Sequence, residues 1–240
     1  MGRLILWPGL GADERMFTRI QSAPPLITPR HLLPRRGEDL PAFARRSADA
    51  LGIEAGDVIG GSSFGGVVAA AIARQRPVRA LVLIGGALDA GGLRPIPGEQ
   101  MVRRLPPFMV RPLLRSERAL QHVFAPEGPE VYELARRMLN ETPDDLLLYG
   151  GRMLIAFRPA QSVGCPVFAL HGGRDPVMSP PPIPDCRLVA EAGHGLAWTH
   201  AAEVTAFLRQ VWSTLQPAPG PDLPGELPGT RLVPAPEPPG

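Results

Sequence analysis

The stretch Asp57-Val58-Ile59-Gly60-Gly61-Ser62-Ser63-Phe64-Gly65-Gly66 joins a short apolar run to a series of small residues. This pattern predicts a buried strand that turns sharply into a helix. We expect the helix to span residues 64–76, because small and apolar residues continue to Arg74 and Pro77 cannot extend a helix. A serine at such a turn projects its hydroxyl away from the backbone. The stretch therefore indicates an α/β fold with a candidate nucleophile between a strand and a helix.

Two neighbouring serines compete for that role. The positions two before and two after a nucleophile at such a turn must lack bulk, because the backbone is crowded there. Gly61 and Gly65 meet this condition around Ser63, whereas Ser62 would place Phe64 at a crowded position. We therefore predict Ser63, at which the dipole of the following helix would point. The pattern is common by chance in a chain with 27 glycines, so the assignment depends on partner residues.

Apolar runs and helical patterns alternate along the rest of the chain. The expected strands are residues 4–7, 31–33, 58–59, 81–84, 167–170 and 188–190. The expected helices are residues 13–20, 40–51, 64–76 and 201–215. Continuous apolar strands that alternate with helices predict a doubly wound α/β domain with a mostly parallel sheet. Such sheets bind ligands beyond the carboxyl ends of their strands.

The alternation breaks off after the strand at 81–84. The break contains helical patterns near residues 98–105, 117–124, 129–140 and 143–157. We expect a helical insertion over about residues 88–160, laid on the carboxyl edge of the sheet as a lid that shapes a pocket and excludes water. Prolines and glycines dominate residues 216–240, which predicts a flexible tail outside a domain of residues 1–215.

Charge and hydropathy exclude several classes of function. The chain has 25 basic residues, all of them arginine, and 23 acidic ones, and a net charge of only +2 weighs against a dedicated nucleic-acid binder. No apolar run approaches the roughly 18 residues of a membrane span, and the apolar segment after Met1 is too short for a signal peptide. We expect a cytoplasmic protein whose partner is a small molecule, with no metal.

A nucleophilic serine needs a base, and the base needs an acid that fixes its tautomer. Asp175 is the preferred acid, because it follows the strand at 167–170 in a glycine-rich turn. The alternative structural role is a turn aspartate that binds local backbone groups. Asp89 is the reserve candidate, since it also follows a strand, but it lacks the glycine framing.

The candidate base is His194, which follows another expected strand between Gly193 and Gly195. Glycines on both sides let the loop bend and bring the imidazole toward the serine. His200, at the start of a helix, is the main competitor. The order Ser63, Asp175, His194 along the chain matches the order of serine, acid and histidine in one serine-hydrolase fold. It differs from the orders found in the other serine-hydrolase folds.

The anionic intermediate of an acyl transfer needs hydrogen-bond donors. The backbone N–H of Phe64, directly after the candidate nucleophile, is one expected donor. The second should come from the loop after the first strand, Trp7-Pro8-Gly9-Leu10-Gly11-Ala12-Asp13, and we assign it to the N–H of Leu10. A tight turn with Asp13 as a helix N-cap is compatible with that role.

With these residues in place, the chain resembles the α/β-hydrolase superfamily from Leu4 to Leu215. Residues 8–17 (PGLGADERMF) resemble a segment of small bacterial members. The resemblance implies a catalytic triad of Ser63, His194 and Asp175, an oxyanion hole at the N–H groups of residues 10 and 64, and no cofactor. It also implies hydrolysis of an ester, thioester or related acyl bond.

The chain departs from many members of the superfamily in two ways. Pro8-Gly9 stands where many members carry His-Gly in the oxyanion loop. The chain also begins almost at the strand that many members reach third, so we expect a sheet of about six strands without the antiparallel edge. A second copy of the chain could cover the exposed edge strand, so a homo-oligomer is one expectation.

The leading hypothesis is a serine hydrolase that cleaves a small to medium carboxylic ester through an acyl-enzyme. The alternatives are an acyltransferase or a carbon–carbon bond hydrolase on the same triad, and a non-catalytic ligand-binding protein. Phe17, Met178 and Trp198 are the predicted substrate-binding residues. Further apolar candidates for the pocket are Met101, Phe108 and Met109.

Overall fold

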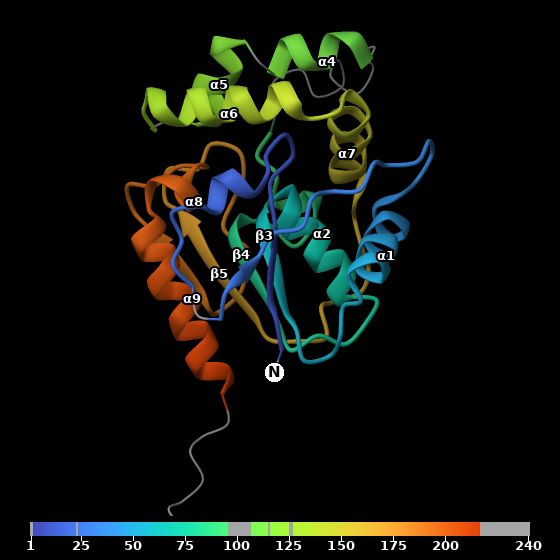
Figure 1. Ribbon diagram of the computed structural model, residues 1–240, viewed down its shortest axis with the longest axis vertical. Coiled ribbons are helices and arrows are strands. Elements are labelled where there is room, and N and C mark those ends of the chain that lie inside the picture. Colours follow the sequence, from blue (N-terminus) through green and yellow to red (C-terminus); the bar gives the residue numbers. More distant parts are fainter. Residues whose placement is uncertain (1, 23, 96–106, 115, 125–126, 217–240) are drawn as a thin grey trace, which may run out of the picture.

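The apolar runs of the chain form strands of a single six-stranded sheet in the order β2-β1-β3-β4-β5-β6, and every pairing is parallel. The computed structural model describes residues 2–22, 24–95, 107–114, 116–124 and 127–216 (Figure 1). The strands are β1 (Leu4–Trp7), β2 (Leu26–Ile27), β3 (Val58–Ser63), β4 (Ala80–Gly86), β5 (Val167–Gly172) and β6 (Cys186–Val189). The predicted six-stranded α/β fold without an antiparallel edge is confirmed for these residues.

Helices cover both faces of the sheet (Figure 1). The helical elements of the described residues are η1 (Glu14–Phe17), α1 (Leu40–Leu51), α2 (Phe64–Ala73), η2 (Ala90–Gly92), α4 (Pro107–Leu114), α5 (Glu117–Val123), α6 (Pro129–Glu141), α7 (Asp144–Ala156), α8 (Leu196–Thr199) and α9 (Ala201–Leu215). Within β1, Ile5 and Trp7 pack into the core on the side of α1 and α2, and Leu4 and Leu6 pack into the core on the side of α9. Burial on both faces explains why the strands are continuous apolar runs.

The first long helix begins and ends where its sequence signals predict. The carboxylate of Asp39 accepts a hydrogen bond from the N–H of Ala42 as the N-cap of α1, and a proline lies in the first turn. Gly52 ends the helix in the left-handed conformation with φ 56°. α1 therefore spans the predicted residues 40–51, as α9 spans the predicted 201–215.

Three expected elements differ from the structure. Residues 31–33 were expected as a strand, but they are irregular, and the second strand is the short β2, which pairs only with Leu4 and Ile5. Residues 13–20 form only the 3₁₀ turn η1, capped by the side chain of Asp13. α2 ends at Ala73 rather than Arg76, because the N–H of Gln75 bonds to the carbonyl of Ile72 and tightens the last turn.

The region between β4 and β5 is helical, as expected. Helices α4 to α7 lie across the end of the sheet at which β3 and β4 finish (Figure 1). α5, α6 and α7 correspond to three expected pieces, whereas α4 was not expected, and the piece at 98–105 lies outside the described residues, as does most of the predicted tail. We call α4 to α7 the helical insertion. Within the described ranges, no helix has the length and apolar character needed to cross a bilayer.

Candidate active site

The turn between β3 and α2 holds Ser63 in a strained conformation. Its φ of 51° makes it the one non-glycine residue with positive φ among the described residues. A Cβ at Gly61 would lie 2.5 Å from the carbonyl oxygen of Trp7, and a Cβ at Gly65 would collide with the carbonyl oxygens of Trp7 and Pro8. The geometry thus explains both glycines and presents the serine at the end of the strand, as expected for a nucleophile elbow.

Ser63, His194 and Asp175 form one hydrogen-bonded chain. The Nε2 of His194 lies 3.1 Å from the Oγ of Ser63, and its Nδ1 lies 2.8 Å from the Oδ2 of Asp175. The serine follows β3, the aspartate follows β5, and the histidine follows β6, so the three loops meet at the carboxyl edge of the sheet. Three residues far apart in the sequence are thus brought together as predicted.

Asp175 is a buried carboxylate in a rich hydrogen-bond environment. Its Oδ1 accepts hydrogen bonds from the N–H groups of Val177, at 2.8 Å, and Met178, at 2.9 Å. Burial alone would raise the pKa of Asp175, but the hydrogen bond and charge of His194, together with these backbone donors, lower it below its usual value. The carboxylate is therefore ionised at neutral pH, which favours a proton on Nδ1 of the histidine and leaves Nε2 free to accept one.

The competing residues lie in other environments. Asp89 caps the short turn η2 through the N–H of Gly91 at 2.6 Å. His200 precedes α9, and its Nδ1 lies 2.8 Å from the Oγ1 of Thr199. Ser62 is buried, with 1% of its surface exposed. Asp89 and His200 thus have local partners and Ser62 is buried, whereas Ser63, Asp175 and His194 share hydrogen bonds.

The predicted oxyanion loop passes directly beside Ser63. A Cβ at Gly9 would lie 3.5 Å from the Cβ of Ser63, so the loop that carries Leu10 runs in contact with the serine. Phe64 begins α2, and the N–H groups of a first helical turn have no acceptor within their own helix. The two N–H groups predicted as oxyanion donors therefore belong to segments that border the serine.

His31 supports the predicted oxyanion loop, a role that the sequence alone does not predict. Its Nε2 lies 2.8 Å from the carbonyl oxygen of Pro8, and its ring packs on Phe64 with a centroid distance of 5.0 Å. Burial lowers the pKa of His31 to about 4, so the ring is neutral and donates through Nε2. The sequence placed His31 in a strand with no motif around it. A histidine that precedes the apolar pair Leu32-Leu33 carries no local pattern that would predict its contact with Pro8.

Glu127 is the second missed residue. It lies in the helical insertion just before α6, with 8% of its surface exposed. Its Oε1 accepts hydrogen bonds of 3.0 Å from the N–H groups of both Gly193 and Gly195, the two neighbours of His194. Burial raises the pKa of Glu127, although the two glycine N–H groups and the charge of the histidine oppose that shift. No local motif marked Glu127, because its partners are distant in sequence.

The predicted substrate-binding residues are scattered. Phe17 and Met178 are 3% and 0% exposed and belong to the cores on opposite faces of the sheet. Trp198 is half-buried beneath the guanidinium of Arg19, whose Cζ lies 3.9 Å from the ring centroid. Their role in substrate binding stays a prediction. Met109 is 45% exposed on α4, and Met101 and the side chain of Phe108 lie outside the described residues.

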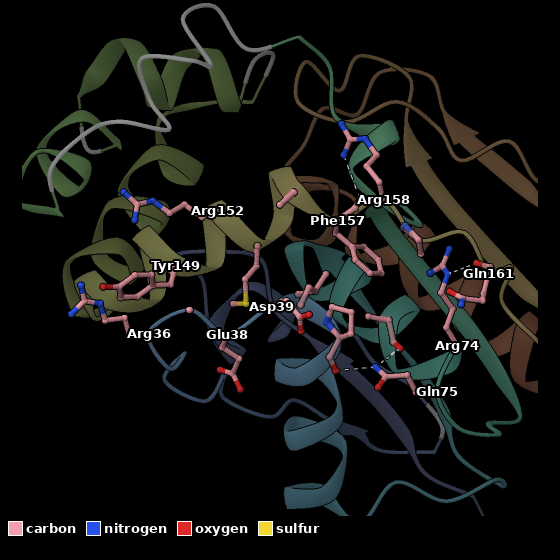
Figure 2. A pocket seen from close by; sticks show the side chains of 17 residues that line it. Arg36, Glu38, Asp39, Arg74, Gln75, Tyr149, Arg152, Phe157, Arg158 and Gln161 are labelled. Carbon is pink, nitrogen blue, oxygen red and sulfur yellow. Dashed lines mark hydrogen bonds between the residues drawn. The ribbon is translucent and has the colours of Figure 1, made fainter.

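A cavity of about 1010 Å³ lies away from the serine, between α7 and the start of α1. Figure 2 shows the labelled side chains of Arg36, Arg74, Tyr149 and Arg152 around it. None of the three hydrogen-bonded residues lines it. In the described part of the chain, no group of three or more His, Cys, Asp or Glu side chains is arranged to hold a metal ion.

The parallel sheet, the strained serine and its hydrogen-bonded histidine define a protein of the α/β-hydrolase type. The sequence matches the alpha/beta hydrolase family over residues 4–207, and the chain belongs to that family. A comparison with curated proteins found no match.

Solved structures with the same fold include named enzymes of bacteria. A thermophilic esterase from Thermogutta terrifontis, solved with malate bound, is 19% identical with a TM-score of 0.65 and 90% of each chain covered. A hydrolase from Oleispira antarctica is 13% identical with a TM-score of 0.69, covering 90% of this chain and 91% of the other. The enol-lactonase from Burkholderia xenovorans LB400 is 16% identical with a TM-score of 0.66, covering 89% and 92%. At these identities the likeness concerns the fold.

Proposed function

We propose that the protein is a serine hydrolase that cleaves a small to medium carboxylic ester, or a related acyl bond, through an acyl-enzyme. The observation that carries this proposal is the hydrogen-bonded chain from Ser63 through His194 to Asp175, with the serine strained at the elbow. Membership of the alpha/beta hydrolase family supports it. The esterases and the lactonase among the structural neighbours agree with an acyl substrate.

The proposed reaction follows from which nitrogen of His194 carries a proton and which can accept one. His194 takes the proton of the Ser63 hydroxyl on Nε2 while Asp175 holds Nδ1–H, and the serine Oγ attacks the carbonyl carbon of the substrate. The N–H groups of Leu10 and Phe64 stabilise the oxyanion. The imidazolium then protonates the leaving alkoxide, which departs as an alcohol. Water, deprotonated by the same imidazole, attacks the acyl-enzyme, releases the acid and restores the serine hydroxyl.

The residues around the proposed site favour an apolar substrate. Leu10 and Phe124 pack against a buried cluster formed by the insertion residues Leu120, Ala135, Leu139 and Leu147. The ring centroid of Phe124 lies 6.4 Å from that of His194. In this proposal the insertion acts as a lid, whose apolar inner side contacts the acyl or alcohol group and excludes water.

The test is hydrolysis of p-nitrophenyl esters of graded chain length, together with labelling by a fluorophosphonate probe. We expect Ser63→Ala to abolish both turnover and labelling. Ser62→Ala is the matched control, because it removes the same hydroxyl from the neighbouring buried position. Labelling of Ser63→Ala at the wild-type level would exclude the assignment, and product analysis with an added alcohol would reveal an acyltransferase.

A further inference from the structure

The helical insertion contacts the loop of His194 through a buried carboxylate. One oxygen of Glu127 receives two hydrogen bonds, from the N–H groups on either side of the histidine. Its other oxygen, Oε2, is buried without a hydrogen-bond partner among the described residues. Burying a carboxylate oxygen without a hydrogen-bond partner costs free energy, so the presence of Glu127 at this position needs an explanation.

The fit around the carboxylate is tight. A Cβ at Gly195 would lie 3.3 Å from Oε1 of Glu127 and 3.2 Å from Cγ1 of Val131. Phe124 approaches the histidine ring from the same segment of the insertion. The loop therefore has little room to move while the carboxylate is in place.

Other contacts hold the insertion independently of Glu127. Arg15 in η1 forms an ion pair of 2.7 Å with Glu141 at the end of α6. Arg19 lies 3.6 Å from Glu130 at the start of the same helix. Leu10 packs against the apolar cluster of the insertion. Since none of these contacts involves Glu127, the carboxylate can be replaced without removing them.

We propose that Glu127 is a positioning residue for His194, and that its carboxylate fixes the two N–H groups around the histidine so that Nε2 stays within reach of the Ser63 hydroxyl. The inference rests on the proposed function of the triad. An imidazole displaced by about 1 Å can cost on the order of 100-fold in rate, because proton transfer depends on alignment. We expect the loss of rate to appear in kcat rather than in KM, because Glu127 acts through the histidine.

The experiment compares Glu127→Ala, Glu127→Asp and Glu127→Gln with Glu133→Ala as the control, because Glu133 is a solvent-accessible carboxylate on α6 that pairs with Arg136 and Arg137 of its own helix. Alanine removes the acceptor and aspartate withdraws it by one methylene, whereas glutamine keeps an oxygen where Oε1 lies. With a p-nitrophenyl ester we expect Glu127→Ala and Glu127→Asp to lose about 100-fold in kcat with little change in KM. Glu127→Gln should stay within a few-fold of wild type, and the kcat of Glu133→Ala should equal that of the wild type.

Hydrogen exchange followed by mass spectrometry gives a readout that does not need activity. We expect faster exchange in the peptide around residues 193–195 of Glu127→Ala and Glu127→Asp, and unchanged exchange in α6. If alanine prevents folding, the aspartate and glutamine variants still decide the question. Unchanged kcat in the aspartate variant, an equal loss in the glutamine variant, or a loss confined to KM would each overturn the inference. Ser63→Ala runs in parallel, because activity that survives in it contradicts the triad rather than the role of Glu127.

Discussion

The Nε2 of His31 lies 2.8 Å from the carbonyl oxygen of Pro8, so a side chain from the region after β2 fixes the loop expected to carry the oxyanion donor. Many members of the superfamily have a histidine at the position of Pro8. In this chain the imidazole of His31 reaches the same loop from outside it and packs against Phe43 and Phe64. The loop is therefore held by a neutral imidazole donor.

The burial of His31 predicts that the stability of the protein depends on pH. The pKa falls from 6.5 to about 4 on folding, so between these values the unfolded chain binds a proton that the folded protein does not. Stability contributed by the neutral ring is therefore complete above pH 6.5 and lost as the pH falls toward 4. The loss should reach about 2 kcal/mol near pH 5.

His31→Gln tests this dependence, because glutamine keeps an N–H donor but does not titrate. Denaturant unfolding of both proteins at about pH 7.5 and about pH 5 should show a loss for the wild type that exceeds the loss for the variant by ~2 kcal/mol. The buried His171, whose pKa burial also lowers, contributes equally to both proteins. Equal losses in the two proteins would contradict the burial of a neutral His31.

A second prediction concerns the glycine after the elbow. A methyl group at Gly65 would collide with the carbonyl oxygens of Trp7 and Pro8, and either α2 or the oxyanion loop must move. We expect Gly65→Ala to lower the free energy of unfolding by ~1–3 kcal/mol. Activity should fall by ~100-fold, because α2 and the loop each carry one of the two proposed oxyanion donors.

Gly164→Ala is the matched control for this substitution. A Cβ there would have no heavy atom within 4 Å, and Gly164 is not among the glycines with positive φ. Its stability and ester hydrolysis should equal those of the wild type. A Gly65→Ala protein with wild-type activity would contradict the close contact between α2 and the loop.

Local patterns were enough to predict five of the six strands of the sheet and the hydrogen-bonded residues. Strands buried on both faces appear as continuous apolar runs, and the crowding of the elbow requires Gly61 and Gly65, so both features leave a signal within a few residues. The glycines that frame His194 mark its loop in the same way. Such local signals mark each of the three hydrogen-bonded side chains in the sequence.

The supporting residues could not be predicted, because their signals are not local. Glu127 contacts residues 66 and 68 positions later, and His31 contacts a backbone carbonyl 23 positions earlier. Neither has a pattern of neighbours that reveals its partner. The expected strand at 31–33 was wrong for a related reason: its apolar residues suggested a strand, but β2 pairs through only two residues, and Leu33 is 57% exposed.

A final prediction distinguishes Asp175 from Asp89, the two candidates for the acid that orients the histidine. Asp175→Asn should leave the fold intact but favour the wrong tautomer of His194, since an amide can donate where the carboxylate only accepts. We expect kcat for ester hydrolysis to fall by about 10³–10⁴-fold, whereas Asp89→Asn should stay within a few-fold of wild type. The asparagine at 89 still offers an oxygen to the N–H of Gly91, so the cap of η2 survives. Steady-state kinetics on the two variants, with thermal unfolding to confirm that both are folded, decides between them. A large loss in Asp89→Asn with little change in Asp175→Asn would transfer the role of the acid to Asp89.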